Sequence, residues 1–374
     1  MTLHPRRMLR ALAVLPVVAA LAVALPDVAS ASSSRAPVSQ RQVTVMTRNL
    51  YLGADLTGIV GAPSLPAAFA AMAQVAGQVE MSQPPKRMAG IADEITSAKP
   101  DIVGLQEVST WHIVGKNPAT GAQVVPPADY DFLGLLLADL AANGTPYHVV
   151  VAQKNFDSTE QLPTAVQALA SFADHDVLIA RDATSAARLQ VLATGSEHFD
   201  AQLVIPVAAL GTSIDFDRGF EWADVQTRGK VWRIVNTHPE AYAPSELGLP
   251  GSDVNGPEMQ ELADVVQTSL PTVVLGDLNS AKGETTRPGY SVMMAAGYSD
   301  TWLSLGLADT DYTCCRNDTL SGGSLYSRID HVLSRGLVNP KSATHVGVDA
   351  FDSAPPMWPT DHAGVVTTVS IGKE

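Results

Sequence analysis

The residues with the clearest potential for chemistry are Asp277 and Asn279, in the stretch Pro271-Thr-Val-Val-Leu-Gly-Asp-Leu-Asn-Ser280. The preceding residues 272–275 are apolar or β-branched and predict a buried strand. Side chains two residues apart on an extended chain point the same way, so the carboxylate and the amide would emerge side by side. Such a pair can hold a divalent cation or a water molecule against a phosphate group. The alternative is a strand that ends in an Asx-turn, where both side chains bond their own backbone.

Six further polar residues stand at or beside the ends of other predicted strands. They are Asn49, Glu107, His238, Asp330, Asp361 and His362. If these strand ends meet at one edge of packed sheets, all eight residues form a single acidic, histidine-bearing pocket. For any one of them a structural role is at least as common, for example Asn49 as a turn residue or Asp330 as an ion-pair partner of Arg328. Their agreement in type and position favours a shared site.

The carboxylates and amides of this set suit a divalent cation. Glu107, with Asn49 and Asp361, offers the oxygen ligands that Mg²⁺ or Mn²⁺ prefers. A bound cation would neutralise phosphate oxygens and stabilise the charge that develops in the transition state. Asp277 could orient and deprotonate the attacking water, and Asn279 could donate a hydrogen bond to the phosphorus centre.

The histidines suit proton transfer beside the same phosphate. A histidine next to a carboxylate is held in one tautomer and can stabilise or protonate the reacting group. His362 with Asp330 is the predicted pair, and His238 would be a second donor that faces the phosphate.

Strand and helix patterns alternate along the chain without repeats, which predicts an α/β architecture. Strands are predicted over residues 43–49, 101–107, 147–152, 176–180, 231–238, 272–275, 327–333 and 363–370. Helices are predicted over residues 67–79, 85–99, 129–142 and 257–268. Every candidate residue is therefore expected at or beside the end of a strand, which is how a sheet edge would position it.

The composition is that of a globular protein, with 374 residues of which 46% are hydrophobic and 17% charged. No Gly/Ser-rich or charged linker interrupts the chain, so a single catalytic domain over residues 43–372 is predicted. The net charge is −14. Affinity for a phosphate backbone comes largely from Lys and Arg, so a general polyanion binder is disfavoured. If the substrate carries a phosphate, a bound metal would have to supply much of the positive charge that binds it.

The first 31 residues predict a signal peptide. It consists of a basic start (Arg6, Arg7, Arg10), an apolar run over residues 11–25 and small residues for cleavage at Ala29-Ser-Ala31. The apolar run is short for a bilayer about 30 Å thick, so secretion is predicted rather than anchoring, by the general or the twin-arginine route. Cleavage would remove three Arg and one Asp and change the net charge from −14 to −16. Residues 32–42 would be a disordered leader.

The two cysteines, Cys314 and Cys315, are adjacent in the sequence. No zinc motif has this spacing. In an exported protein they could form a disulfide between neighbours, although neighbouring Cα atoms stand only about 3.8 Å apart, which is less than ordinary disulfides prefer. A buried or unpaired thiol pair is the alternative.

Six short segments, taken in order, resemble the endonuclease/exonuclease/phosphatase superfamily. They are Met46-Thr-Arg-Asn49-Leu50, Asp101-Ile-Val-Gly-Leu-Gln-Glu107, Asn236-Thr-His238, Gly276-Asp277-Leu-Asn279, Arg328-Ile-Asp330 and Thr360-Asp361-His362. Each is short, but the ordered set runs from residue 43 to about residue 370 and is specific. The resemblance implies a four-layer α/β/β/α sandwich, with two packed mixed sheets, helices on the outside and the active site at one rim.

The resemblance also implies roles for individual residues. It implies that Glu107 ligates the metal, with Asn49 and Asp361 nearby. Asp277 and Asn279 would act on water and phosphate. His362 would pair with Asp330, and His238 would match the second histidine of the family. Arg228, which Gly229 follows, would match a phosphate-side arginine. The segment over residues 56–83 is longer than expected for the family and apolar. Its role would be extra helical packing or, alternatively, a lid that favours a lipid or another bulky substrate.

The leading hypothesis is a secreted phosphoester hydrolase that depends on Mg²⁺ (or Mn²⁺), more specifically a phosphodiesterase. Nucleic acid is narrowly favoured over phospholipid as the substrate. The alternatives are a sphingomyelinase-like phosphodiesterase that acts on lipid head groups, a phosphomonoesterase and, less favoured, a non-catalytic binding protein on the same fold. The sequence implies no stable protein partner.

Overall fold

The computed structural model describes residues 42–182, 189–353 and 355–372. The predicted signal peptide and residues 32–41 of the predicted leader lie outside the described residues, so export stays a prediction, as do the domain boundaries. Gln42, which was assigned to the leader, already belongs to the first strand.

The first of two large sheets has eight strands, and its centre is built from the chain's first and last strands. The order is β15 (Val338–Val346), β18 (Gly364–Ile371), β1 (Gln42–Asn49), β2 (Ile102–Gln106), β6 (Ala170–Arg181), β3 (Thr110–Ile113) and β4 (Ala128–Asp131), with β5 (Tyr147–Asp157) also paired to β6. β1 and β2 are parallel, whereas β18 is antiparallel to β1 and β6 is antiparallel to β2. The sheet is therefore mixed.

The second large sheet has six strands and is also mixed. The order is β13 (Ser299–Asp300), β14 (Asp330–Arg335), β12 (Thr272–Asp277), β11 (Lys230–Thr237), β10 (Gly219–Thr227) and β7 (Gln190–His198). β11 and β12 are parallel, and the other pairs are antiparallel. Two small hairpins stand apart from it, β8 (Val204–Val207) with β9 (Thr212–Asp215) and β16 (Asp352–Ser353) with β17 (Pro356–Met357).

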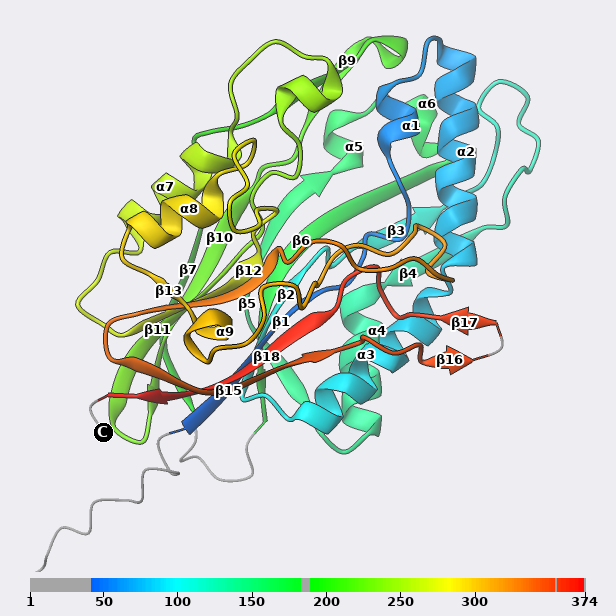
Figure 1. Cartoon of the computed structure of the whole chain (residues 1–374). Helices are drawn as coiled ribbons and strands as arrows, with labels where there is room; N and C mark the ends of the chain where they lie inside the picture. The colour runs from blue at the N-terminus through cyan, green and yellow to red at the C-terminus, as the bar shows by residue number, and fades with distance from the viewer. Residues whose placement is uncertain (1–41, 183–188, 354, 373–374) are drawn as a thin grey trace, which may run out of the picture. The chain divides into compact units, whose positions relative to one another are not determined.

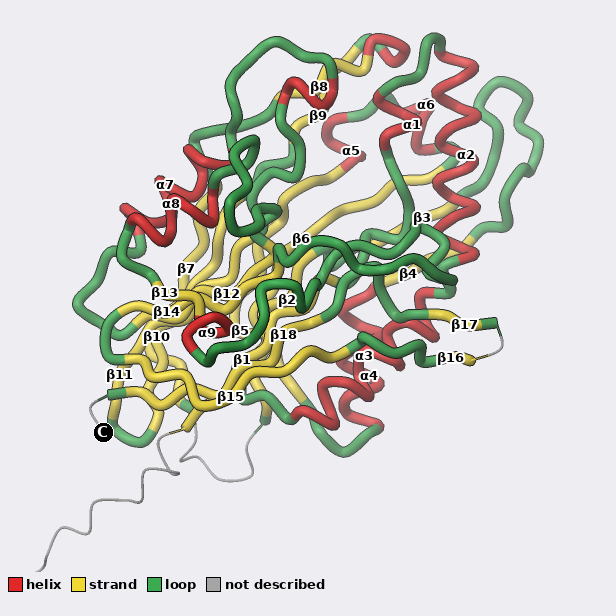
Figure 2. Tube along the Cα trace, viewed as in Figure 1, coloured by secondary structure: helices red, strands yellow, loops and turns green. Residues whose placement is uncertain are grey.

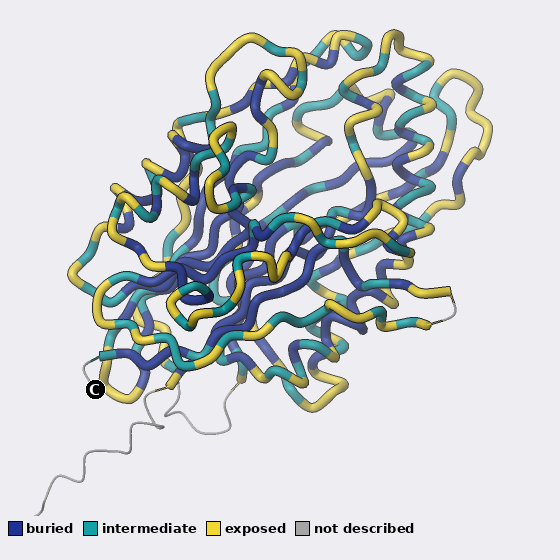
Figure 3. The backbone as a smooth tube through the Cα atoms, viewed as in Figure 1, coloured by how far each residue is buried: buried dark blue, intermediate teal, exposed yellow. Residues whose placement is uncertain are grey.

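The two large sheets pack face to face, with helices on their outer faces (Figures 1 and 2). Alternation along β1 shows the arrangement, since Val45 packs between the sheets while the next residue, Met46, packs under helices. α2 (Leu65–Met81), α3 (Pro84–Ala98) and α4 (Phe132–Ala142) cover the first sheet, and α7 (Asn255–Val265) and α8 (Gly289–Ala295) cover the second. The strands form the buried centre (Figure 3). The predicted four-layer α/β/β/α sandwich is confirmed.

The described part of the chain also has four short α-helices, α1 (Thr57–Val60), α5 (Ser158–Gln161), α6 (Thr164–Gln167) and α9 (Thr301–Ser304), and two 3₁₀ helices, η2 (Ala208–Leu210) and η3 (Pro244–Leu247). The predicted helices correspond to α2, α3, α4 and α7, although the first residues of the range 129–142 form β4 instead. Ten of the described strands were not predicted, namely β3, β4, β7, β8, β9, β10, β13, β15, β16 and β17. Over the described ranges, the helices are too short or too polar for any one of them to span a bilayer.

The topology brings the candidate residues to one edge. β1 and β2 run in parallel and end together, with Asn49 in register with Gln106. β11 and β12 also end together, and the antiparallel β14 begins there with Asp330 opposite Asp277. The ends of four strands therefore meet the start of a fifth, and the polar residues at these positions come from segments far apart in the sequence.

Candidate active site

Asn49 connects the two sheets at this edge. Its Nδ2 donates to Glu107 Oε1 at 2.9 Å and to Asp277 Oδ2 at 3.1 Å. Its Oδ1 accepts from the Tyr51 backbone N–H at 2.8 Å. In this orientation the amide N–H groups of Asn49 hold the two carboxylates close to each other, and ligation of a cation by Asn49 stays a prediction.

Glu107 and Asn279 have left-handed backbone conformations just after their strands. Glu107 has φ 55° and Asn279 has φ 48°. Asn tolerates this region well, whereas for Glu it costs about 1–2 kcal/mol. Glu107 is held there by Asn49 and by the Leu52 N–H, which donates to its Oε2. The sharp turn at the end of each strand aims both side chains into the same cavity.

His362 is paired with Asp330, as predicted. Its Nδ1 lies 2.8 Å from Asp330 Oδ2, and its Nε2 lies 3.7 Å from Asp277 Oδ2. Burial works against the charged imidazole, but Asp330, Asp361 and Asp277 outweigh it and raise the pKa of His362 well above its ordinary value. The raised pKa favours the imidazolium form of His362, in which both ring nitrogens carry a proton.

His238 has the opposite protonation state. Burial, Arg218 and His362 hold the pKa of His238 well below its ordinary value, so this imidazole is neutral. Arg218 Nη1 lies 3.2 Å from His238 Nδ1 and must be the donor. The proton of His238 therefore sits on Nε2, which faces Asp277 Oδ2 at 3.6 Å.

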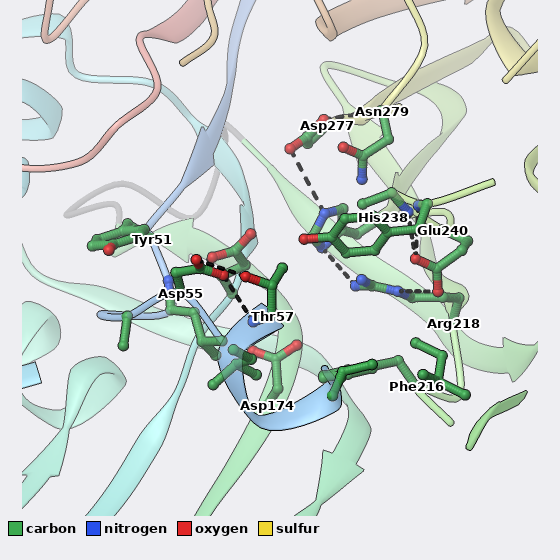
Figure 4. A pocket seen from close by; sticks show the side chains of 18 of the residues that line it. Tyr51, Asp55, Thr57, Asp174, Phe216, Arg218, His238, Glu240, Asp277 and Asn279 are labelled. Atoms are coloured by element: carbon green, nitrogen blue, oxygen red, sulfur yellow. Dashed lines mark hydrogen bonds and ion pairs between the residues drawn. The ribbon is translucent and has the colours of Figure 1, made fainter. Parts of the chain in front are cut away.

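These groups line one cavity of about 400 Å³ (Figure 4). Figure 4 shows Tyr51 and Asp55 on one side, facing His238 and Arg218 on the other. The predicted site residues that line it are Glu107, His238, Asp277, Asn279, Asp361 and His362. Asn49 and Asp330 lie directly behind them and contact Asp277 and His362. The structure thus brings together eight of the nine residues predicted for the site.

Negative charge is concentrated on the floor of this cavity. Burial and the nearby Asp330 raise the pKa of Asp277 to about 7. Burial and Glu107 likewise raise the pKa of Asp361 to about 6, against the opposing effect of His362. Several buried carboxylates that repel one another are stabilised by a divalent cation, and their oxygens suit Mg²⁺ or Mn²⁺. The residues therefore fit the predicted metal, with Glu107 and Asp361 as the carboxylates that would hold it.

The ninth predicted residue, Arg228, lies elsewhere. Arg228 and Gly229 form the turn between β10 and β11, with φ 47° and 77°. His238 follows the other end of β11, so the turn stands a full strand length away from it. The arginine beside the site is Arg218, immediately before β10, because β10 begins where β11 ends. The sequence Arg-Gly occurs both at Arg218-Gly219 and at Arg228-Gly229. Only the pairing of β10 with β11 shows which of the two arginines lies beside His238.

Other residues of the site were also missed. Asp174 lines the cavity, and burial and Glu107 raise its pKa to about 7. Tyr51 and Tyr242 also line it. The alternative role of Asp330 as an ion-pair partner of Arg328 is wrong, because Arg328 bonds Asp300 and Asp309 instead.

Cys314 and Cys315 form a disulfide, and the peptide bond between them is cis. Cys315 Sγ lies 3.8 Å from His362 Nε2. The adjacent pair, for which the sequence left two alternatives, is thus a disulfide at the border of the site.

The protein is an α/β sandwich of two packed mixed sheets. Carboxylates and histidines are gathered in a cavity at the shared rim of the sheets, as in the active site of a hydrolase. The model of the endonuclease/exonuclease/phosphatase family matches residues 77–362, so the chain belongs to this family. Its members are metal-dependent phosphoester hydrolases. A comparison with curated proteins finds no match.

Solved structures share the fold at low sequence identity. A family protein from Bacteroides thetaiotaomicron is 15% identical with a TM-score of 0.55, over 89% of this chain and 98% of that one. D. rerio TDP2 complexed with a single-strand DNA product is 14% identical with a TM-score of 0.53, over 88% and 98%. A mannosyl-6-phosphatase from B. thetaiotaomicron is 15% identical with a TM-score of 0.52, over 87% and 99%. Proteins of this fold thus differ in substrate.

Proposed function

We propose that the protein hydrolyses phosphodiesters by attack of water on phosphorus, with the help of Mg²⁺ or Mn²⁺. The observation that carries this proposal is the position of Asp277. Its carboxylate lies within 4 Å of Asn49, His238 and His362 and belongs to a cavity that also holds Glu107 and Asp361.

Each residue has a distinct part in this reaction. Asp277 orients the attacking water and accepts its proton, which suits a carboxyl whose burial and neighbour Asp330 raise its pKa to about 7. The imidazolium of His362 stabilises the negative charge that grows on the phosphate and protonates the leaving oxygen. His238 donates from Nε2 to a phosphate oxygen, and Arg218 keeps that tautomer in place. The cation, when bound, neutralises phosphate oxygens.

The test is hydrolysis of a small phosphodiester with Mg²⁺ and with EDTA. EDTA is expected to abolish turnover. Asp277→Ala and His362→Ala are each expected to lower kcat by about 10²–10⁴-fold, because each removes an acid–base group. His112→Ala is the control, since His112 is exposed and is not among the residues that line the cavity. Full activity of either site variant, or a folded wild-type protein that turns over no ester, would reject the proposal.

A further inference from the structure

One wall of the cavity is apolar. Its side chains come from three separate segments: the stretch that ends in α1, the β8–β9 hairpin with the residues after it, and η3 (Pro244–Leu247). They are Leu56, Val60, Ile205, Ile214, Phe216 and Leu247. The same cavity holds the carboxylates and histidines of its polar floor, so a ligand whose phosphate lies on the floor can extend along this apolar surface.

This wall is a packed part of the fold. Ile59 of α1 is buried in the same hydrophobic cluster as Ile205 and Ile214, and Leu56 and Val60 pack against that cluster. Leu56 and Val60 are half-buried. Apolar side chains that are held in place yet only partly covered gain free energy when a ligand covers them.

The charge of the cavity disfavours substrates that carry several phosphates. Of the described residues that line it, Arg218 is the only lysine or arginine, and it already faces Glu240 at 3.7 Å. Three of the exposed lining residues, Asp55, Glu246 and Asp318, are acidic, and the other exposed lining residues are uncharged. A polynucleotide or a polyphosphate would place further phosphates beside these carboxylates, whereas binding of such chains depends on Lys and Arg contacts.

We infer that the substrate is a phosphodiester with a single phosphate and that one of its two alcohols is apolar. This apolar group lies against the wall of Leu56, Val60, Ile214 and Phe216. This inference rests on the proposed function and specifies its substrate. The segment over residues 56–83 thereby has two roles: α2 packs on the first sheet, and α1 contributes to the wall.

The test compares p-nitrophenyl phosphate diesters that differ only in the second alcohol. The methyl and octyl diesters carry the same charge and the same leaving group, so their ratio of kcat/KM reports on the apolar group. We expect the octyl ester to be favoured by about 10- to 100-fold, the gain from burial of two or three methylene groups. The thymidine diester with the same leaving group and a DNA oligonucleotide are expected to be poorer substrates than the octyl ester.

Variants of the wall locate the preference. Leu56→Asn and Val60→Asn are each expected to lower kcat/KM for the octyl ester several-fold more than for the methyl ester. Leu65→Asn is the matched control, because Leu65 is an exposed leucine of the same segment that is not among the lining residues. It is expected to change neither rate. Thermal unfolding of each variant shows that it is folded.

The outcomes separate the inference from the proposed function. Hydrolysis of the methyl ester with no preference for octyl, or faster cleavage of the oligonucleotide, overturns the inference and leaves the proposed function intact. A folded protein that hydrolyses none of the esters with Mg²⁺ overturns both. Monomeric dihexanoyl phosphatidylcholine and phosphatidylcholine vesicles then distinguish an enzyme that takes dissolved esters from one that takes lipids out of a bilayer. Cleavage of either supports an apolar ester, and cleavage of DNA but of neither lipid contradicts it.

Discussion

His238 and His362 both lie within 4 Å of Asp277 Oδ2, and their charges differ because their other neighbours differ. His362 is surrounded by carboxylates, which keep it protonated in spite of burial. His238 contacts Arg218, which adds to the effect of burial and keeps it neutral. One residue type thus supplies an acid and a neutral donor within one cavity.

Replacement of Arg218 by Lys tests its part in this arrangement. Lys keeps a positive charge near Glu240 but cannot reproduce the planar contact with His238 Nδ1. We expect kcat/KM to fall by about 10- to 100-fold, the effect of one lost hydrogen bond to a charged group. The matched control is Arg228→Lys at the β10–β11 turn, which is expected to have wild-type kinetics. Equal losses in the two variants would contradict the assignment of Arg218.

A buried ion pair outside the cavity provides a test by pH. Burial alone would raise the pKa of Asp300, but His331 and Arg328 outweigh it and hold the pKa well below its usual range. Because the folded pKa is depressed, the stabilising contribution is complete above about pH 4 and is lost as the pH falls below that value. Asp300→Asn should lower the free energy of unfolding by about 3–5 kcal/mol at neutral pH, since it leaves Arg328 without one buried partner.

The measurement is urea unfolding of both proteins at about pH 7 and about pH 4, and then at lower pH, where the difference should shrink. Glu160→Gln is the control, because Glu160 and Lys154 form an exposed pair worth about 0–1 kcal/mol. A difference between wild type and Asp300→Asn that stays constant as the pH falls would contradict the ion-pair explanation.

At the scale of elements, the close pairing of β11 and β12 positions His238 against Asp277. Gly276 lies opposite Thr237 in this parallel pair. A Cβ at Gly276 would collide with the backbone carbonyl oxygen of Thr237, the residue just before His238. The glycine therefore allows the two strands to deliver both side chains to the same point.

Gly276→Ala tests this close approach. Because the colliding atom belongs to the backbone, the strands must move apart, and we expect the free energy of unfolding to fall by about 1–3 kcal/mol. The rate should fall as well, because His238 moves with Thr237. Denaturant unfolding and kcat measure the two effects.

Gly77→Ala is the matched control for that change. Gly77 lies inside α2, and a Cβ there meets open space. Alanine is the better helix former, so we expect a gain of about 0.5–1 kcal/mol with unchanged turnover. If both alanine variants were equally stable, strand separation would not be the explanation for the first.

At the scale of the whole molecule, a cation that binds the carboxylates of the cavity should raise the free energy of unfolding. A ligand that binds only the folded state stabilises it, so Mg²⁺ at about 100 times its Kd should raise the free energy of unfolding by about 2.7 kcal/mol. Glu107→Gln should lose most of this gain. Glu160→Gln should keep it, because Glu160 is an exposed carboxylate that pairs with Lys154. Thermal unfolding with Mg²⁺ and with EDTA measures this effect without reference to activity, and an equal shift in both variants would contradict ligation by Glu107.

The sequence by itself determined the α/β class, the main elements and eight residues that the structure brings together at one cavity. These features are local, because periodicity within a segment predicts the element and a polar residue at its end marks the sheet edge. The order of six short motifs along the chain then identified the family.

Only the tertiary structure decided how these segments combine. Strand pairing is non-local, so the hairpin that places Arg218 at the site and Arg228 a strand length away could not be read from two identical Arg-Gly pairs. The opposite charge states of His238 and His362 arise from neighbours brought in by folding. The apolar wall, built from α1, β8–β9 and η3, exists only where those distant segments pack together, because a cavity is a property of the packed chain and not of any single segment.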